Sequence, residues 1–289
     1  MMSVIVPVHN EQDAIEGVLP SIAKALDGFI EYEIIVVDDG STDDTLQRVK
    51  NVSTKNLTVI NHVENLGYGK SLFYGILSAK YPCIAIIDGD GSYVAEDLKD
   101  LYSNYPQYHM VIGARKGRSY DRGPIKKCAR FLFTHLVEYA SGRKVLDVNS
   151  GLRIFNKDIV MGFQDSLCTG FSFTTTLTLI FSLNQYYIKY VTVKYNERIG
   201  KSKVKHFRDT LRAAQIIIET ILYYNPLKLF LLMASVNVVI GLALETLNYY
   251  IFKNPFFSIL SAICIASFLP IFCLGLIADQ LKKIYKQRR

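Results

Sequence analysis

The chain has 289 residues, a formal net charge of +7 and five scattered cysteines. An odd number of cysteines without CxxC spacing argues against a disulfide framework or a zinc site, and it fits a reducing compartment. No nucleic-acid-binding motif accompanies the positive charge, so we expect no nucleic-acid partner. Part of the charge is a basic tail directly after an apolar run, as on the cytosolic flanks of membrane helices: Lys282, Lys283, Lys286, Arg288 and Arg289.

Five apolar runs that read as buried strands alternate with segments of helical periodicity. The runs are residues 3–8, 34–37, 57–61, 83–87 and 110–114. Strands alternating with helices predict an α/β fold with a doubly wound, mostly parallel sheet. The first run is not preceded by a basic n-region, so we expect no signal peptide and a catalytic half that stays in the cytosol.

The fourth run ends in two carboxylates, Asp88 and Asp90, separated by one glycine. Ligands of open α/β sheets bind at the carboxyl ends of the strands. A hard cation such as Mg²⁺ prefers one or two carboxylates together with phosphate oxygens. Gly89 and Gly91 would permit a tight backbone and the close approach of a ligand. Ordinary turn chemistry is the alternative interpretation of the same residues.

Polar residues follow the other strand runs as well. Asp38 and Asp39 suit the base and ribose hydroxyls of a nucleoside, or they cap the next helix. Residues 65–71 have the glycines of a phosphate loop without its spacing, so Lys70 either reaches a phosphate or is solvated. A basic stretch before residue 131 suits an anionic head group, and its best candidates are Lys126, Lys127 and Arg130.

In their order along the chain, six motifs resemble those of family 2 glycosyltransferases, which have the GT-A fold. They are Val6-Pro7-Val8-His9-Asn10-Glu11, Val37-Asp38-Asp39-Gly40-Ser41-Thr42-Asp43, Asn65-Leu66-Gly67-Tyr68-Gly69-Lys70, Asp88-Gly89-Asp90-Gly91-Ser92, Asp147-Val148-Asn149-Ser150-Gly151-Leu152-Arg153 and Arg198-Ile199-Gly200-Lys201-Ser202-Lys203. The last two are similar to the D-x-x-S-G-x-R and R-x-x-G-x-S-K signatures of polyprenyl-phosphate glycosyltransferases. That branch includes dolichol-phosphate mannose synthases and bacterial glucosyl relatives.

The resemblance implies a role for each matching residue. The nucleotide-sugar site would contain Pro7, Val8, Glu11, Asp39, Lys70, Asp88, Gly89 and Asp90. A Mg²⁺ or Mn²⁺ site would contain Asp88, Asp90 and Ser92. The acceptor-phosphate site would contain Arg115, Lys126, Lys127, Arg130, Ser150, Arg153, Arg198, Ser202 and Lys203. The catalytic residues would be Asp90, Arg115, Asp147, Arg198 and Lys203. Ser92 stands where the mannose synthases often have glutamine, a departure that argues against mannose specificity.

The C-terminal part predicts a membrane anchor. We expect a catalytic domain over residues 1–205, an amphipathic juxtamembrane helix over 206–226, two transmembrane helices over 227–252 and 256–278, and a cytosolic tail over 282–289. Each apolar run is long enough to cross about 30 Å of hydrocarbon. Pro270 would kink the second helix. Glu245 and Asn237 are costly in lipid, so they should face the partner helix or another copy of the chain.

The resemblance and the membrane anchor together predict a metal-dependent sugar transfer from a UDP- or GDP-hexose to a polyprenyl (dolichyl or undecaprenyl) phosphate at the cytosolic membrane face, with the inversion that the resemblance implies. A phosphate monoester is largely dianionic at neutral pH, with a second pKa of about 6, so no strong general base is needed. Transfer to a lipid hydroxyl is an alternative that does need a base, and Asp147 is the first candidate for it. A catalytically silent membrane scaffold is a second alternative.

Overall fold

The computed structural model describes residues 1–116, 131, 134–139, 141–164, 173–199, 215 and 218–287. The chain divides into two compact units, Met1–Ile217 and Ile218–Arg289. The first unit contains the sheet and the predicted site, and the second is a helical hairpin. Each unit is described separately below.

A seven-stranded sheet forms the centre of the first unit. Its strands are β1 (Met2–Val8), β2 (Tyr32–Asp38), β3 (Leu57–Asn61), β4 (Cys83–Ile86), β5 (Met110–Lys116), β6 (Arg153–Asn156) and β7 (Ile188–Lys194), in the spatial order β3-β2-β1-β4-β6-β5-β7. All neighbouring pairs are parallel except those that involve β6, which runs antiparallel to β4 and β5. The predicted α/β class and mostly parallel sheet are therefore confirmed.

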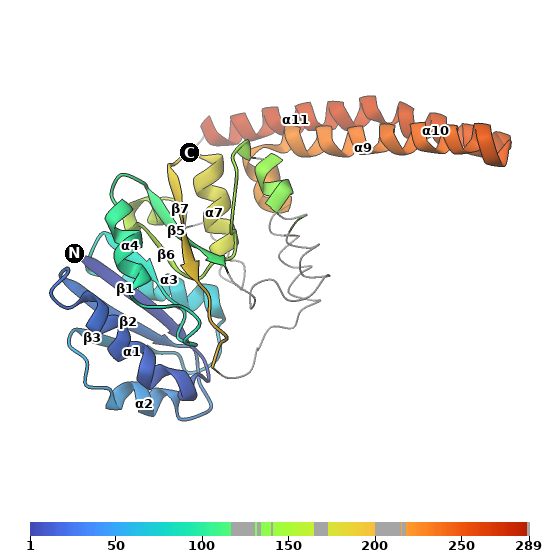
Figure 1. Ribbon diagram of the computed structural model, residues 1–289. Helices are drawn as coiled ribbons and strands as arrows, with labels where there is room; N and C mark the ends of the chain where they lie inside the picture. Colours follow the sequence, from blue (N-terminus) through green and yellow to red (C-terminus); the bar gives the residue numbers. More distant parts are fainter. Residues whose placement is uncertain are drawn as a thin grey trace. The chain divides into compact units, whose positions relative to one another are not determined.

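Helices cover both faces of this sheet (Figure 1). The helices on one face are α1 (Gln12–Leu26), α2 (Thr45–Asn51) and α4 (Asp97–Asn104), and those on the other are α3 (Tyr68–Ser78) and α7 (Phe173–Leu183); the short α6 (Lys157–Met161) follows β6. Helix α1 buries Ile15, Leu19 and Ile22 against the sheet. Because these positions recur at helical spacing, one stripe of α1 contributes to the core while its other face meets solvent.

The antiparallel direction of β6 decides which residues meet at the site. Parallel strands place their carboxyl ends at one edge of a sheet, where ligands of such folds bind. A strand that runs the opposite way places its first residue at that same edge. Arg153, the first residue of β6, and the loop that precedes it therefore lie beside the turn that follows β4.

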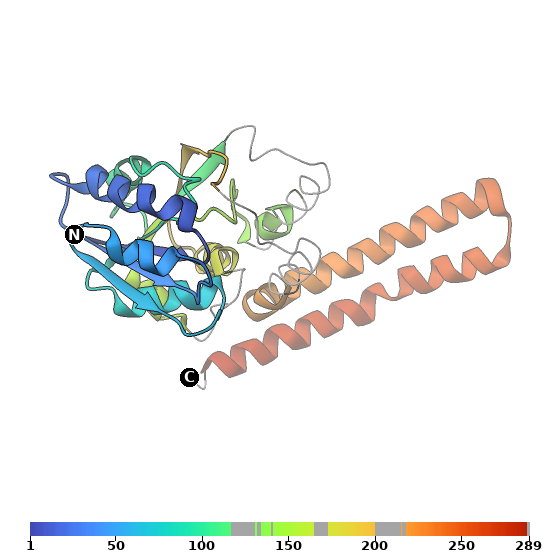
Figure 2. The ribbon, with the colours of Figure 1, turned by 90° about the horizontal axis from the view of Figure 1, so that it is seen from below.

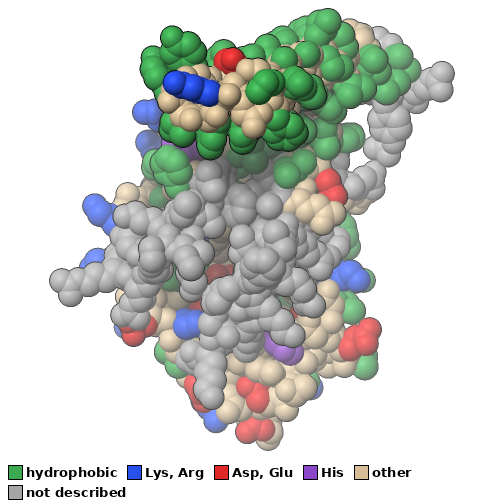
Figure 3. All heavy atoms as spheres, turned by 90° about the vertical axis from the view of Figure 1, so that its right-hand side faces the viewer, with side chains coloured by type: hydrophobic (Ala, Val, Ile, Leu, Met, Phe, Trp, Pro, Cys, Tyr) green, Lys and Arg blue, Asp and Glu red, His purple; other side chains and the backbone are tan. Residues whose placement is uncertain are grey.

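The second unit is a hairpin of two long apolar helical stretches, Pro226–Phe252 and Pro255–Ile284. The first comprises α9 (Pro226–Leu247) and a π-helical turn (Asn248–Phe252), and the second comprises α10 (Pro255–Ala266) and α11 (Phe268–Gln287). The two stretches lie side by side in both ribbon views (Figures 1 and 2). Both are long and apolar enough to cross a membrane, with only 11% of each apolar window buried. The hairpin surface visible in Figure 3 is predominantly hydrophobic.

Small residues bring the two stretches together. A Cβ at Gly241 would lie 2.7 Å from the Ile265 side chain, and one at Gly275 would lie 2.7 Å from Cβ of Phe230. Glycine at a helix interface permits this approach, which drives helix association in lipid. The Glu245 carboxylate accepts a hydrogen bond of 3.2 Å from Ser258 on α10, so it faces the partner helix as predicted.

The second stretch is interrupted at Ser267, three residues before Pro270. A proline cannot donate to the carbonyl four residues earlier, and its ring clashes with that carbonyl. The helix assignment is therefore interrupted one turn ahead of Pro270, and the kink itself stays a prediction. Most of the expected juxtamembrane helix lies outside the described residues; residues 218–224 of it are helical.

Candidate active site

The turn after β4 brings two carboxylates to the edge of the sheet. The Asp90 carboxylate accepts hydrogen bonds from the backbone N–H of Ser92 at 3.0 Å and from the Ser92 hydroxyl at 2.5 Å. Gly91 has a φ of +73°, in the region that glycine adopts at no steric cost. The Ser92 hydroxyl is fully buried and bound to Asp90, so it supports Asp90 in this structure, and its role as a metal ligand stays a prediction.

A segment after β7 crosses this turn and carries Arg198. The backbone N–H of Ile199 donates to the carbonyl oxygen of Asp90 at 3.0 Å. The guanidinium of Arg198 lies between two carboxylates, with one nitrogen 3.0 Å from Glu11 and 3.5 Å from Asp90. Its Nε is buried and has no hydrogen-bond partner among the residues that the structure describes. The structure thus brings together three predicted site residues that are far apart in the sequence.

Asp88 lies next to Asp90 and is partly buried. Burial and the neighbouring Asp90 carboxylate raise the pKa of Asp88 to about 6, against the lowering effects of Tyr68, Arg115 and Arg198. The hydroxyl of Tyr68 donates to Asp88 at 2.9 Å, and burial raises the pKa of Tyr68 well above its usual value, so this tyrosine keeps its proton. Two carboxylates held close together are an arrangement that a divalent cation would relieve.

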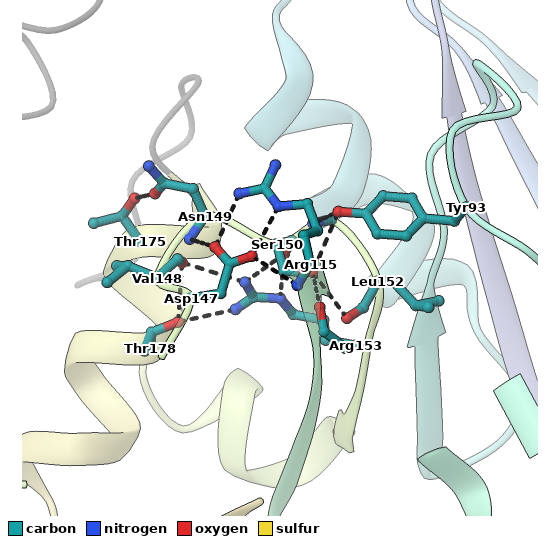
Figure 4. A network of polar contacts seen from close by, with 12 residues as sticks. Tyr93, Arg115, Asp147, Val148, Asn149, Ser150, Leu152, Arg153, Thr175 and Thr178 are labelled. Carbon is teal, nitrogen blue, oxygen red and sulfur yellow. Dashed lines mark hydrogen bonds and ion pairs between the residues drawn. The ribbon is translucent and has the colours of Figure 1, made fainter. Parts of the chain in front are cut away.

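Arg115 and Asp147 form a bidentate ion pair on the other side of the site (Figure 4). The two N–H···O contacts measure 2.8 and 2.9 Å, and the backbone N–H of Arg115 adds a third contact at 3.2 Å. The guanidinium also lies 5.3 Å from the centre of the Tyr195 ring. Since Asp147 is almost fully buried and both of its oxygens accept from Arg115, it is poorly placed to take a proton from a substrate.

Arg153 and Ser150 are fully buried, which contradicts their predicted contact with an acceptor phosphate. The Arg153 guanidinium donates to the carbonyl oxygens of Ser150, Val148 and Thr174 and to the hydroxyl of Thr178 (Figure 4). The Ser150 hydroxyl donates to the carbonyl oxygen of Gly113 at 2.5 Å. Both side chains therefore bind the loop before β6 to the interior of the domain. Burial there lowers the pKa of Arg153.

The predicted nucleotide side of the site begins with Asp39. Its carboxylate accepts from the backbone N–H groups of Leu66 and Gly67 at 2.9 and 2.8 Å, and it lies 3.0 Å from Nδ1 of His62. Asp39 thus binds the loop that connects β3 to α3. Lys70 is exposed in the first turn of α3.

Pro7 and Val8 are buried at the end of β1, and their side chains do not face solvent. Val8 packs against Gly89 so closely that a Cβ there would lie 2.5 Å from a Val8 methyl group. The carbonyl oxygen of Val8 accepts from the backbone N–H of Asp39 at 2.9 Å. These residues shape the site through backbone and packing, and their contact with a nucleotide sugar stays a prediction.

Five predicted residues lie outside the described part of the chain: Lys126, Lys127, Arg130, Ser202 and Lys203. The structure also identifies Tyr68 and Tyr93, for which the sequence analysis predicted no role. Tyr93 accepts from the backbone N–H of Gly151 at 2.8 Å. The only sequence signal for Tyr68 is its place between the two glycines that precede Lys70.

Comparison with known families agrees with this geometry. The family model described as "Glycosyl transferase family 2" matches residues 3–173, more than half of the chain. The chain belongs to glycosyl transferase family 2. A second model, "GtrB C-terminal hairpin", matches residues 225–284 of this glycosyltransferase.

Curated relatives of this family 2 glycosyltransferase act on polyprenyl phosphates. A dolichyl-phosphate beta-glucosyltransferase of Trichomonas vaginalis is 25% identical over 76% of this chain and 71% of the relative. A dolichyl-phosphate hexose transferase of Haloferax volcanii is 26% identical over 71% of this chain and 87% of the relative. A dodecaprenyl-phosphate galacturonate synthase of Rhizobium johnstonii is 27% identical over 55% of this chain and 48% of the relative. The predicted resemblance to the polyprenyl-phosphate branch is thereby confirmed.

Solved structures support the fold. Glucosyl-3-phosphoglycerate synthase from Mycobacterium tuberculosis, in complex with Mn²⁺, UDP-glucose and phosphoglyceric acid, matches 76% of this chain and 79% of its own with a TM-score of 0.61 and 21% identity. The same enzyme in complex with Mg²⁺ and UDP has a TM-score of 0.61 and 22% identity. The expected GT-A-like catalytic domain is thereby confirmed.

Proposed function

We propose that this glycosyltransferase transfers a sugar, with inversion, from a UDP- or GDP-hexose to the phosphate of a membrane polyprenol of the dolichyl or undecaprenyl type. The product would be a lipid-linked sugar donor for glycan or protein glycosylation. The observation that carries the proposal is the joining of a family 2 domain to an apolar helical hairpin. Relatives named for transfer to dolichyl and dodecaprenyl phosphates support the same acceptor.

We further propose a divalent cation, Mg²⁺ or Mn²⁺, at Asp88 and Asp90. Within the described ranges, no group of three or more His, Cys, Asp or Glu side chains could hold a metal. Two carboxylates are nevertheless enough for a cation that takes its other ligands from diphosphate oxygens and water. When bound, the cation would neutralise charge on the leaving nucleoside diphosphate. The structural relative with Mn²⁺ and UDP-glucose supports this site.

The transfer forms a bond between an acceptor phosphate oxygen and the anomeric carbon of the sugar. The bond from that carbon to the donor diphosphate breaks, and its electron pair leaves with the nucleoside diphosphate. No proton is removed because the acceptor phosphate is already largely dianionic, with a second pKa of about 6. Arg115 and Arg198 would balance the phosphate charges, together with Lys203, and electrostatic positioning would supply most of the acceleration.

The geometry of Asp147 favours a phosphate acceptor over a lipid hydroxyl. A hydroxyl acceptor needs a general base within hydrogen-bond reach of its proton. Asp147 is occupied by the bidentate contact with Arg115, and we propose that it positions Arg115 instead of acting as a base. The expected catalytic role of Asp147 thus becomes indirect.

We propose that the hairpin spans the bilayer and that the catalytic domain and the basic tail are both cytosolic. Two crossings return the chain to its starting side, and positive charge collects on cytosolic flanks. The hairpin would hold the acceptor lipid in the same membrane as the catalytic domain. Contacts between copies through the hairpin are part of the same proposal, with Asn237 as the candidate polar residue.

A transfer assay in detergent tests the proposal. Purified protein is offered a panel of radiolabelled UDP- and GDP-sugars with Mg²⁺ or Mn²⁺, with and without a polyprenyl phosphate. We expect label to enter the lipid phase from one donor, only when both metal and lipid phosphate are present. Donor turnover without lipid labelling would refute polyprenyl phosphate as the acceptor. The absence of any donor binding in folded protein would refute the proposed glycosyltransferase activity.

A further inference from the structure

The Asp88 carboxylate is held from two sides by groups outside its own turn. On one side, the Tyr68 hydroxyl donates to Oδ1 at 2.9 Å. On the other side, the backbone at Gly151 lies so close that a Cβ at this position would overlap both Asp88 oxygens. The carboxylate therefore lies against both a phenol and a stretch of bare backbone, and we call this pair of contacts the slot.

The Gly151 side of the slot is rigidly supported. The backbone N–H of Gly151 donates to the Tyr93 hydroxyl at 2.8 Å, and that hydroxyl lies 3.2 Å from the Ser150 hydroxyl. Arg153 donates to the carbonyl oxygen of Ser150 through two nitrogens. Since these groups are buried, the backbone facing Asp88 cannot move without breaking several hydrogen bonds.

The Tyr68 side is fixed by the predicted nucleotide residue Asp39. Tyr68 is the first residue of α3, and Gly67 before it has a φ of +98°. Asp39 accepts from the backbone N–H groups of Leu66 and Gly67 and so fixes the strand-to-helix connection from which Tyr68 projects. Asp39 is thus linked to Asp88 by hydrogen bonds at both ends of the segment from Leu66 to Tyr68.

We infer that Tyr68 and Gly151 are positioning residues that fix the orientation of the Asp88 carboxylate and thereby set the affinity of the site for a divalent cation. The inference rests on the proposed metal site of this glycosyltransferase. A carboxylate ligand with a fixed orientation loses less freedom when it binds a metal, and outer partners of metal ligands typically change metal affinity by about 10- to 100-fold. Because the protein supplies only two carboxylates to the proposed metal site, the orientation of each one strongly affects the metal affinity.

The first test is Tyr68→Phe, which removes one oxygen and keeps the ring. We expect its Kd for Mn²⁺, measured by electron paramagnetic resonance in the presence of UDP and in its absence, to rise about tenfold. The matched control is Tyr74→Phe on the same helix, whose half-exposed ring packs against His62 away from Asp88. Tyr74→Phe should bind Mn²⁺ as the wild type does.

Turnover as a function of Mn²⁺ concentration gives a second readout. We expect Tyr68→Phe to need more Mn²⁺ for half-maximal turnover and to approach wild-type kcat at saturating metal. A lower midpoint of thermal unfolding with an unchanged Kd for Mn²⁺ would show a merely structural role and overturn the inference. Wild-type protein that binds no Mn²⁺ with or without UDP would instead overturn the metal site of the proposed function.

Gly151→Ala tests the other side of the slot. The added methyl group would push the Asp88 carboxylate from its position, so we expect a larger rise in the Kd for Mn²⁺ than in Tyr68→Phe. Circular dichroism checks that the variant is folded. If folded Gly151→Ala kept wild-type Mn²⁺ affinity, the slot would not control the carboxylate, and the inference would fail even with Tyr68→Phe impaired.

Discussion

Two segments with signature sequences meet at the edge of the sheet and differ in what their polar side chains contact. In residues 88–92, the carboxylates of Asp88 and Asp90 meet side chains from distant parts of the chain, Tyr68 at the start of α3 and Arg198 after β7. In residues 147–153, Arg153 is enclosed and donates to backbone carbonyl oxygens of its own loop and of α7. The first segment presents carboxylates at the predicted site, whereas the Arg153 and Ser150 side chains of the second are buried and bind backbone carbonyl oxygens. A matching motif therefore does not tell which of its residues contact substrate.

The largest effect is expected from Asp90→Asn. Asparagine keeps an oxygen that can accept from Ser92, so the turn should survive, while the loss of charge weakens metal and diphosphate binding. We expect kcat/KM to fall by about 10²- to 10³-fold, as when a preorganised electrostatic contact is removed. Steady-state transfer to polyprenyl phosphate measures this effect, and thermal unfolding should be nearly unchanged. A variant with wild-type kcat/KM would remove Asp90 from the site.

A pair of arginine variants distinguishes a buried structural arginine from one that contacts the carboxylates of the site. Arg153→Met should lower the free energy of unfolding by about 2–4 kcal/mol, because a buried hydrogen bond to a charged group contributes about 1.5–3 kcal/mol. Arg198→Met should unfold like the wild type and lose turnover, since Arg198 is 28% exposed and faces carboxylates at the site. Chemical denaturation and transfer kinetics on both proteins test the contrast. Equal stability of the two variants would contradict the enclosed role of Arg153.

The smallest effect is expected from Ser92→Ala. If Ser92 only supports Asp90, the variant loses one side-chain hydrogen bond, worth about 1 kcal/mol, and its Kd for Mn²⁺ rises by a few-fold. If Ser92 were a metal ligand, its loss would raise the Kd for Mn²⁺ far more. Calorimetric titration with Mn²⁺ distinguishes the two roles, and a rise well beyond the roughly 100-fold that an outer partner can cause would place Ser92 in the ligand set.

The sequence predicted the strands that are continuous apolar runs and the carboxylates that follow them. It also predicted the hairpin, because length and hydropathy determine it. It did not predict β6, since a four-residue strand that begins with arginine carries little apolar pattern and its pairing is non-local. Without β6, nothing in the sequence indicated that Arg153 is buried. An arginine in a motif resembles an anion ligand, and only the structure shows that its acceptors are three carbonyl oxygens and the Thr178 hydroxyl.

Tyr68 was missed for a related reason. Its hydroxyl reaches Asp88 only because α3 begins beside the turn after β4, and neither periodicity nor composition encodes that neighbourhood. The role expected for Asp39 was incomplete in the same way. The sequence indicated a nucleotide contact, and the structure adds the backbone N–H groups that its carboxylate binds.

The tip of the hairpin bears on how the two helices could enter a bilayer. The Asn248 side chain donates to Ser258 at 2.8 Å and accepts from the backbone N–H of Asn254 at 2.8 Å. Glu245 accepts from the same Ser258. Polar groups that satisfy one another cost less to move through hydrocarbon than groups that must shed water unpaired. The hydrogen bonds at this connection therefore lower the cost of bringing its polar groups close to hydrocarbon.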